Sequence, residues 1–350
     1  MIDLDDRAAL ARIDRADMRA LLRAFPDQID EAGEWQADVP SLDAIDRIVV
    51  CGMGGSAIGG DLLATLWGQW GVARPVVTVR GYALPPWVDD RTLAIMVSYS
   101  GNTEETLACA RQARKRGCAM LAITSGGQLA ELARSADVPL ILVPGDQPPR
   151  ASLGYLLAPL LRSLAPHIDR DVAADIDAAL PLIRSLVAEL DESPHDANRA
   201  KQLARDLEGA IPVCYGSAGL TEPVARRWKT QLNENAKSPA YWDVVPELNH
   251  NELMGWEGDD LADRASYVLL RDADEASSVA RRLEITADML RDRGLQVREV
   301  QLSGETLMAR MLGLIVLGDW VSYYRAMLRE VDPTPVALIE RFKAKMAEAF

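Results

Sequence analysis

Cysteine and histidine are scarce in this 350-residue chain, and long apolar runs are missing. The four cysteines form no Cys-x-x-Cys pair and lie in apolar segments, so we expect small buried side chains rather than disulfides or metal ligands. No stretch approaches the ~18 apolar residues of a membrane span, and the acidic N-terminus has no apolar signal core. The chain is therefore expected to be soluble, not membrane-bound, and cytoplasmic, in a reducing compartment.

Basic residues are also in deficit. The 38 Lys and Arg residues face 52 Asp and Glu residues, which gives a net charge of −14. A nucleic-acid-binding protein should carry a basic patch, so no nucleic-acid partner is expected. An anionic small molecule stays open as a ligand, because a local site can be positive on an acidic protein.

Short apolar segments alternate with helical patterns along the chain. We expect strands at 48–51, 76–79, 93–97, 119–124 and 140–143, and later at 213–215, 267–270 and 297–302. This alternation predicts the α/β class, with mostly parallel sheets flanked by helices. The expected divisions are an N-terminal helical segment (1–40), a first domain (41–165), a helical linker (166–209) and a second domain with a C-terminal helix (210–350). Both domains open with strand, Gly/Ser loop and helix, a weak internal repeat.

A glycine-rich loop follows the first strand. Gly52-x-Gly54-x-x-Ala57 fits the dinucleotide fingerprint, in which glycines let backbone N–H groups approach an anion at a helix N-terminus. Such a site also needs an acidic residue at the end of the next strand, where this chain has Arg80. The pattern disfavours NAD but leaves an NADP site open.

Hydroxyl side chains follow the third strand. Ser98, Ser100 and Thr103 lie within six residues of one another, just before a helix for which Thr103 is a plausible N-cap. Together with Ser56 they would present hydroxyls and two helix N-termini to one spot, which suits a phosphate monoester better than a pyrophosphate. The alternative is that these residues only cap helices and shape turns.

Three further residues are candidates for the site, two of them for acid–base chemistry. Glu234 ends a polar helical motif, His250 lies in a loop among Asn and Glu residues, and Arg150 precedes a helix at the edge of the first sheet. Histidine is the natural proton carrier at neutral pH. One histidine with such neighbours does not make a zinc site. A solvated Glu234, a structural His250 and a surface Arg150 are the alternatives; His167 and His195 are expected at the surface.

Several of these stretches resemble the bifunctional phosphoglucose/phosphomannose isomerase family, a branch of the sugar-isomerase (SIS) proteins. The resemblance is carried, in chain order, by 52–61 (GMGGSAIGGD), 98–106 (SYSGNTEET), 150–155 (RASLGY), 233–237 (NENAK), 247–252 (ELNHNE) and 332–336 (DPTPV). It covers nearly the whole chain. The first two motifs are shared by SIS proteins in general, whereas the fourth and fifth are specific to this branch.

The resemblance implies two SIS-type domains and a homodimer with its active site at the subunit interface, where the neighbouring subunit lends the histidine. It implies a hexose-phosphate substrate, no metal and no cofactor. The phosphate-binding residues would be Gly54, Gly55, Ser56, Ser98, Ser100 and Thr103. Glu234 would move the proton between C1 and C2, Arg150 would stabilise the enediolate, and His250 would open the sugar ring. Lys343, favoured over Lys345, would assist ring opening, and Thr334 would lie near the sugar and allow either configuration at C2.

The implied reaction interconverts glucose 6-phosphate, and also mannose 6-phosphate, with fructose 6-phosphate through an enediolate. The main rival is a non-catalytic regulator on the same fold, which would need neither Glu234 nor His250 and would often carry a DNA-binding helix-turn-helix, for which the N-terminal segment leaves little room. A glucosamine-phosphate synthase would need a glutamine-hydrolysing domain. A dehydrogenase would need added nicotinamide cofactor.

Overall fold

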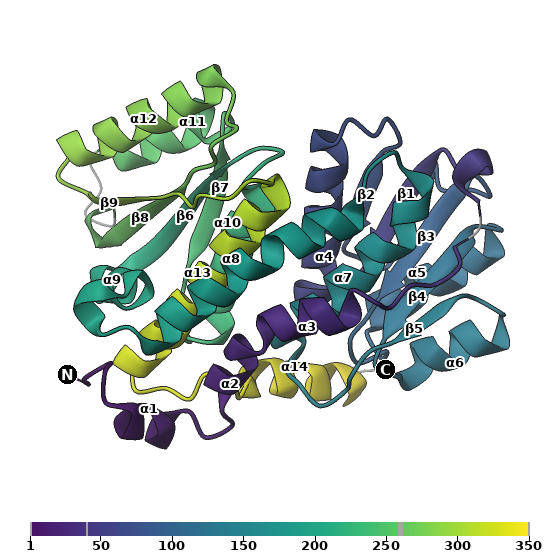
Figure 1. The fold of residues 1–350 in the computed structure, drawn as a ribbon, viewed down its shortest axis with the longest axis horizontal. Helices are drawn as coiled ribbons and strands as arrows, with labels where there is room; N and C mark the ends of the chain where they lie inside the picture. Colours follow the sequence, from purple (N-terminus) through teal and green to yellow (C-terminus); the bar gives the residue numbers. More distant parts are fainter. Residues whose placement is uncertain (1, 40, 258–261, 349–350) are drawn as a thin grey trace.

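Two parallel β-sheets, one in each half of the chain, form the framework of the protein (Figure 1). The computed structural model describes residues 2–39, 41–257 and 262–348. The first sheet has the strand order β2-β1-β3-β4-β5 and the second has the order β7-β6-β8-β9. Each strand pair is parallel, which confirms the predicted α/β class.

The strands are short, and the central ones are buried. Their bounds are β1 Arg47–Cys51, β2 Val76–Val79, β3 Thr92–Val97, β4 Ala119–Thr124, β5 Leu140–Leu142, β6 Ile211–Ser217, β7 Tyr241–Val245, β8 Ala265–Leu270 and β9 Gln296–Val300. All six residues of β3 are buried, as expected for a central strand covered on both faces. The eight expected strands are present, although β9 ends two residues early. β7 was not predicted.

The helices fill the space around and between the sheets. Their bounds are α1 Arg7–Ile13, α2 Met18–Arg23, α3 Phe25–Ala32, α4 Gly54–Gln69, α5 Glu104–Lys115, α6 Gly127–Ser135, α7 Leu153–Leu164, α8 Val172–Glu192, α9 Arg199–Asp206, α10 Glu222–Glu234, α11 Leu248–Asn251, α12 Ser277–Asp292, α13 Leu307–Leu328 and α14 Ala337–Glu348. Within the described part of the chain, no helix combines the length and apolar character needed to cross a membrane.

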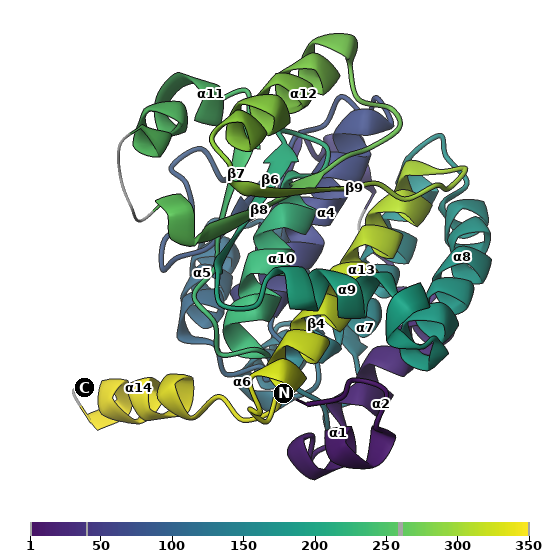
Figure 2. The same ribbon diagram turned by 90° about the vertical axis from the view of Figure 1, so that its left-hand side faces the viewer.

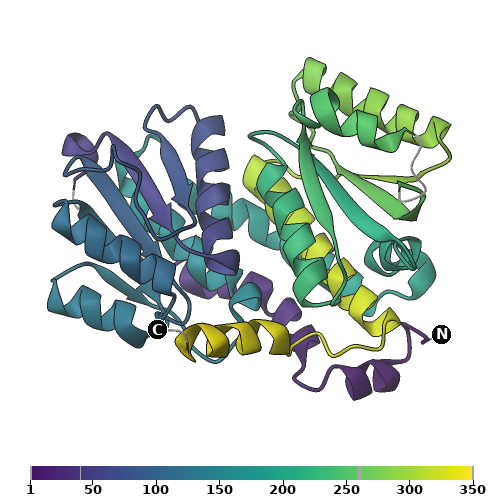
Figure 3. The same ribbon diagram turned by 180° about the vertical axis from the view of Figure 1, so that it is seen from behind.

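The two sheets are topological repeats. The order β7-β6-β8-β9 repeats the order β2-β1-β3-β4, and in each half the strand that opens the sheet runs through a loop into a long helix. These two helices, α4 and α10, pack against each other between the sheets (Figure 3). The carboxyl ends of β1 and β3, where ligands bind in open parallel sheets, therefore lie near the boundary between the halves.

The helix α13 joins the halves through a shared core. Nearly all of its residues are buried, and it packs against α8, α9 and α10. The main hydrophobic cluster runs from Leu4 to Met327 and includes residues of both sheets. The helices of the region 166–209 lie against this core.

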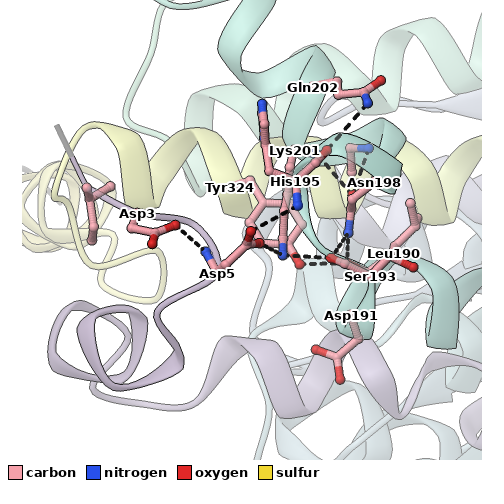
Figure 4. A network of polar contacts seen from close by, with 12 residues as sticks. Asp3, Asp5, Leu190, Asp191, Ser193, His195, Asn198, Lys201, Gln202 and Tyr324 are labelled. Carbon is pink, nitrogen blue, oxygen red and sulfur yellow. Dashed lines mark hydrogen bonds and ion pairs between the residues drawn. The ribbon is translucent and has the colours of Figure 1, made fainter.

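A polar network fastens the N-terminal segment to α8 and α9 (Figure 4). The buried Lys201 ammonium donates to Asp5 Oδ1 at 2.7 Å and to the Ser193 carbonyl at 2.9 Å, and it lies 5.3 Å from the centre of the Tyr324 ring. Asn198 caps α9 by accepting the N–H groups of Ala200 and Lys201. The backbone N–H of His195 donates to Asp5 Oδ2 at 3.1 Å. His195, expected at the surface, is half-buried in this network.

The last helix, α14, projects from the rest of the molecule (Figure 2). Its Leu338 and Phe342 side chains are 80% and 64% exposed. The turn before it, at Pro333 and Thr334, remains in the body of the protein, and Pro333 is buried.

Candidate active site

The loop after β1 and the loop after β3 meet through Ser56. Its Oγ accepts the backbone N–H of Tyr99 at 3.2 Å, and the side chain is buried. Because the hydroxyl accepts in this bond, its own proton stays available for a ligand. Ser56 stands in the first turn of α4, whose N-terminus favours an anion.

The loop after β3 is held by its own hydroxyls. Ser98 Oγ lies 2.9 Å from Thr103 Oγ1 and accepts the Gly101 N–H at 3.1 Å. Ser100 is exposed and accepts the Asn102 N–H at 3.3 Å. Thr103 occupies the N-cap position of α5, but its side chain makes no capping hydrogen bond. The predicted N-cap position is therefore confirmed without its capping hydrogen bond, because the hydroxyl pairs with Ser98 instead.

Gly101 holds this loop against the next one. Its φ is +67°, and a Cβ there would lie 1.8 Å from the carbonyl oxygen of Gly126. Only glycine fits this close approach.

Arg150 connects the loops after β1 and β3 to the second half of the chain. A Cβ on Gly55 would lie 3.1 Å from the Pro149 carbonyl and 3.2 Å from Arg150 Cα, so this glycine lets the Arg150 backbone lie directly on the first turn of α4. The Arg150 side chain is 4% exposed, and its Nη1 lies 3.5 Å from Oε2 of Glu234, the last residue of α10. The predicted anion site and the predicted base thus lie on opposite sides of one arginine.

The acceptors around Arg150 are mostly uncharged. Its Nε donates to Asn235 Oδ1 at 2.6 Å, and Nη2 donates to the carbonyls of Pro333 and Thr334 at 2.7 and 2.8 Å. A guanidinium has five N–H donors, two of them on Nη1. The Nη1 of Arg150 faces Glu234, and its two donors make no hydrogen bond within the described chain. Burial lowers the pKa of Arg150, while Glu234 opposes this. The positive charge is therefore available to a ligand beside Glu234.

The turn before α14 closes this side of the site. Thr334 Oγ1 is buried and has no hydrogen-bond partner among the described residues. A buried hydroxyl without a partner costs free energy unless a ligand or water supplies one. This side chain therefore suits a sugar hydroxyl.

Lys237 also points into this region. Its Nζ donates to the carbonyls of Glu234 at 2.5 Å and Pro333 at 3.0 Å. Burial, and then the neighbouring Arg150, lower the pKa of Lys237 to about 8.

A second buried arginine supports the first. Arg227 Nη2 donates to the Arg150 carbonyl at 2.9 Å and to Asp319 Oδ2 at 2.7 Å, and its Nε donates to Asp319 Oδ1 at 3.1 Å. Gln231 Nε2 also donates to Asp319 Oδ1, at 2.8 Å. The sequence reasoning missed Asp319, although a lone acid inside the apolar run 311–321 signals a buried partner.

Three expected site residues lie apart from this cluster in a single chain. His250 is exposed on α11, where its backbone N–H donates to the Glu247 carbonyl at 2.9 Å. Lys343 and Lys345 are exposed on the projecting α14. The structure thus brings together the hydroxyl loops, Arg150, Glu234 and Thr334, but not His250 or either lysine.

The position considered for NADP is occupied by an ion pair. Arg80 Nη2 pairs with Asp61, whose Oδ2 also lies 3.7 Å from Arg226 Nε. A carboxylate so placed would repel a ribose 2′-phosphate, which weakens the nicotinamide alternative. In residues 2–39, 41–257 and 262–348, no group of three or more His, Cys, Asp and Glu side chains could hold a metal ion.

Comparison with known proteins identifies the families of the two domains. The SIS domain family matches residues 41–162, and the bacterial phospho-glucose isomerase C-terminal SIS domain matches residues 196–346. The solved structure of a glucose-6-phosphate isomerase like protein from Thermus thermophilus superposes with a TM-score of 0.66 at 21% identity, covering 98% of this chain and 99% of that one. This likeness shows the fold.

Curated relatives extend over almost the whole chain. The bifunctional phosphoglucose/phosphomannose isomerase of Caldicellulosiruptor bescii is 39% identical over 333 residues, which cover 93% of this chain and 97% of the relative. The enzyme of the same name from Aquifex aeolicus is 38% identical over 313 residues, covering 89% and 94%. This chain belongs to the bifunctional phosphoglucose/phosphomannose isomerase family.

Proposed function

We propose that this chain is an isomerase of sugar phosphates that interconverts glucose 6-phosphate, and mannose 6-phosphate, with fructose 6-phosphate in the cytoplasm. The observation that carries the proposal is the position of Arg150, whose backbone lies on Gly55 of the phosphate loop and whose guanidinium faces Glu234. Membership of the family and the 39% identity to a named isomerase support it. The four free cysteines, three of them buried, suit a reducing compartment.

The phosphate is the handle that positions the sugar. We assign its binding to the N–H groups of Gly54 and Gly55 and to the hydroxyls of Ser56, Ser98, Ser100 and Thr103. Binding energy from this remote group would hold the open-chain sugar with its C1–C2 edge at Glu234.

The proton transfer then proceeds through an enediolate. The Glu234 carboxylate removes the proton from C2 of the aldose, and the electron pair moves to the C1 carbonyl oxygen. Arg150 stabilises the negative charge on that oxygen. The O2 hydroxyl loses its proton, the O1 atom gains one, and Glu234 returns its proton to C1 to give the ketose. Thr334 would contact the sugar near C2, whose configuration separates glucose from mannose. No step uses a metal.

Ring opening is assigned to His250 and Lys343, with Lys345 as the alternative lysine. Since His250 is exposed and lies apart from Glu234 in one chain, we propose that a second copy supplies it, in a homodimer. Mixing two inactive variants, Glu234→Gln and His250→Ala, tests this. A homodimer that shares sites should recover about a quarter of wild-type activity after subunit exchange. If His250 acts within its own chain, the mixture stays inactive.

The main test is a coupled assay of the three hexose phosphates on one preparation. The isomerase reaction runs without added nicotinamide cofactor and with a chelator present. We expect turnover that the chelator does not change. Glu234→Gln should lower kcat by about a thousandfold and abolish exchange of the C2 proton with solvent deuterium, while fructose 6-phosphate still binds. Glu222→Gln, at the other end of α10, is the matched control. Binding without turnover by the wild type would instead favour a regulator.

A further inference from the structure

The proposed mechanism leaves Lys237 without a role, although its backbone and side chain are both unusual. It lies just beyond the C-cap of α10 with φ +50°. This left-handed region favours glycine, and long side chains seldom occupy it. A lysine in this strained conformation points to a use for its side chain.

The ammonium of Lys237 joins two segments of the site. One of its acceptors is the carbonyl of Glu234 itself, at 2.5 Å, and the other is the carbonyl of Pro333, at 3.0 Å. The Pro333 carbonyl also accepts Arg150 Nη2 at 2.7 Å. Two cations therefore share one acceptor, and the end of α10 is tied to the turn that carries Thr334.

The charged groups around Lys237 come from four elements. Arg150 faces it from the turn before α7, Glu234 from α10, and Asp332 from the segment that precedes α14. Arg329, just after α13, donates to the Lys237 carbonyl at 3.5 Å. Burial and Arg150 destabilise the ammonium, while Asp332 and Glu234 stabilise it, and the pKa falls to about 8.

We propose that Lys237 is a positioning residue for the isomerase reaction, which clamps the backbone of Glu234 to the Pro333–Thr334 turn and so holds the carboxylate at its working distance from Arg150. This inference rests on the roles proposed for Glu234 and Arg150. A base must lie about 3–3.5 Å from the atom it deprotonates, and a displacement of about 1 Å can lower the rate about a hundredfold. The last residue of a helix is the one most easily displaced, because its carbonyl has no partner within the helix.

Lys237→Gly tests the proposal because it removes the ammonium and relieves the backbone conformation together. We expect this variant to melt no lower than the wild type, with kcat reduced about tenfold to a hundredfold and KM for fructose 6-phosphate little changed. Asp137→Gly is the matched control: Asp137 is exposed after α6 with φ +52°. It should also melt no lower, at full activity.

The pH dependence separates positioning from a purely structural role. Lys237 is charged below a pH of about 8, so wild-type kcat should fall as the pH rises through that value. Lys237→Gly should lack this alkaline limb. If Lys237→Gly keeps wild-type kcat and the limb, the inference is overturned while the proposed function stands. If the wild type turns over none of the three hexose phosphates, the proposed function fails and this inference fails with it.

Discussion

Breaking the buried ion pair between Arg227 and Asp319 by a single isosteric substitution should strongly lower the free energy of unfolding of this protein. Arg227 is 2% exposed and Asp319 8%. Asp319 accepts two hydrogen bonds from Arg227 and one from Gln231. The substitution Asp319→Asn keeps the shape but removes the charge, and its amide places N–H groups where Arg227 needs an acceptor.

The magnitude follows from the environment of the pair. Removing one partner of a buried ion pair leaves the other charge without compensation, which costs about 3–5 kcal/mol. Burial raises the pKa of the Asp319 carboxyl, against the opposing effect of Arg227. Desolvation therefore outweighs attraction, so removing both charges should be cheaper than removing one. In Arg227→Met/Asp319→Leu, the losses left are the hydrogen bonds to Gln231 and to the Arg150 carbonyl, about 1 kcal/mol each.

Urea unfolding and the thermal midpoint measure this directly. Asp319→Asn should lower the midpoint by roughly 5–10 °C, and the double variant should recover part of that loss. The control is Arg184→Gln, which removes a pair with Asp27 and Asp30 whose three side chains are 44%, 72% and 58% exposed. This change should cost under about 1 kcal/mol. An Asp319→Asn variant within about 1 kcal/mol of the wild type would refute the reasoning.

Two further predictions concern the loop after β3 and the pH dependence of stability. Gly101→Ala should destabilise the protein by more than about 2 kcal/mol and raise KM for each hexose phosphate, because the new Cβ collides with the next loop. The control is Gly71→Ala, at φ +73° in open surroundings. It should cost about 1–2 kcal/mol and leave KM unchanged. Burial raises the pKa of Glu252 to about 7 from 4.5, with Tyr215 lowering it and Asp243 raising it. In this pH range Glu252 is protonated more in the folded state than in the unfolded state. The free energy of unfolding should therefore fall by about 1–2 kcal/mol between pH 5 and 8. Glu252→Gln should flatten this dependence in urea titrations; an unchanged slope would contradict the assignment.

Strands with a continuous run of apolar or β-branched residues were predicted best from the sequence. β3 is an unbroken apolar run, and its six residues are all buried. β7 escaped prediction because an aspartate interrupts its sequence, Tyr-Trp-Asp-Val-Val, which has no clear alternation. β2 is also an edge strand with one buried residue, but all four of its residues, Val-Val-Thr-Val, are β-branched, and it was predicted. Local pattern reports burial and β-propensity, so a half-exposed strand of mixed composition leaves a weak signal.

Part of the site, too, could be predicted from the sequence, and part could not. Ser56, Ser98, Ser100 and Thr103 could be predicted as one group because the ends of neighbouring parallel strands meet at one edge. The proximity of Arg150 to Glu234 could not be derived from spacing, since 84 residues separate them and they belong to different halves of the chain, and it was expected from the family resemblance alone. The role of Asp319 follows from tertiary contacts between α10 and α13, which no local pattern contains.

The two buried arginines differ in their acceptors, and this difference suits one to stabilising the fold and the other to the reaction. Arg227 is neutralised by a carboxylate, and its Nη2 also donates to the Arg150 carbonyl at 2.9 Å. Arg150 instead receives an amide oxygen and two carbonyls as its close acceptors, with its nearest carboxylate at 3.5 Å. Neutral acceptors fix the position of a guanidinium without cancelling its charge, and an oriented charge that needs no rearrangement stabilises a developing oxyanion most effectively. A second carboxylate against Arg150 would make it a structural arginine like its neighbour, and the enediolate would then compete with the protein for the same charge.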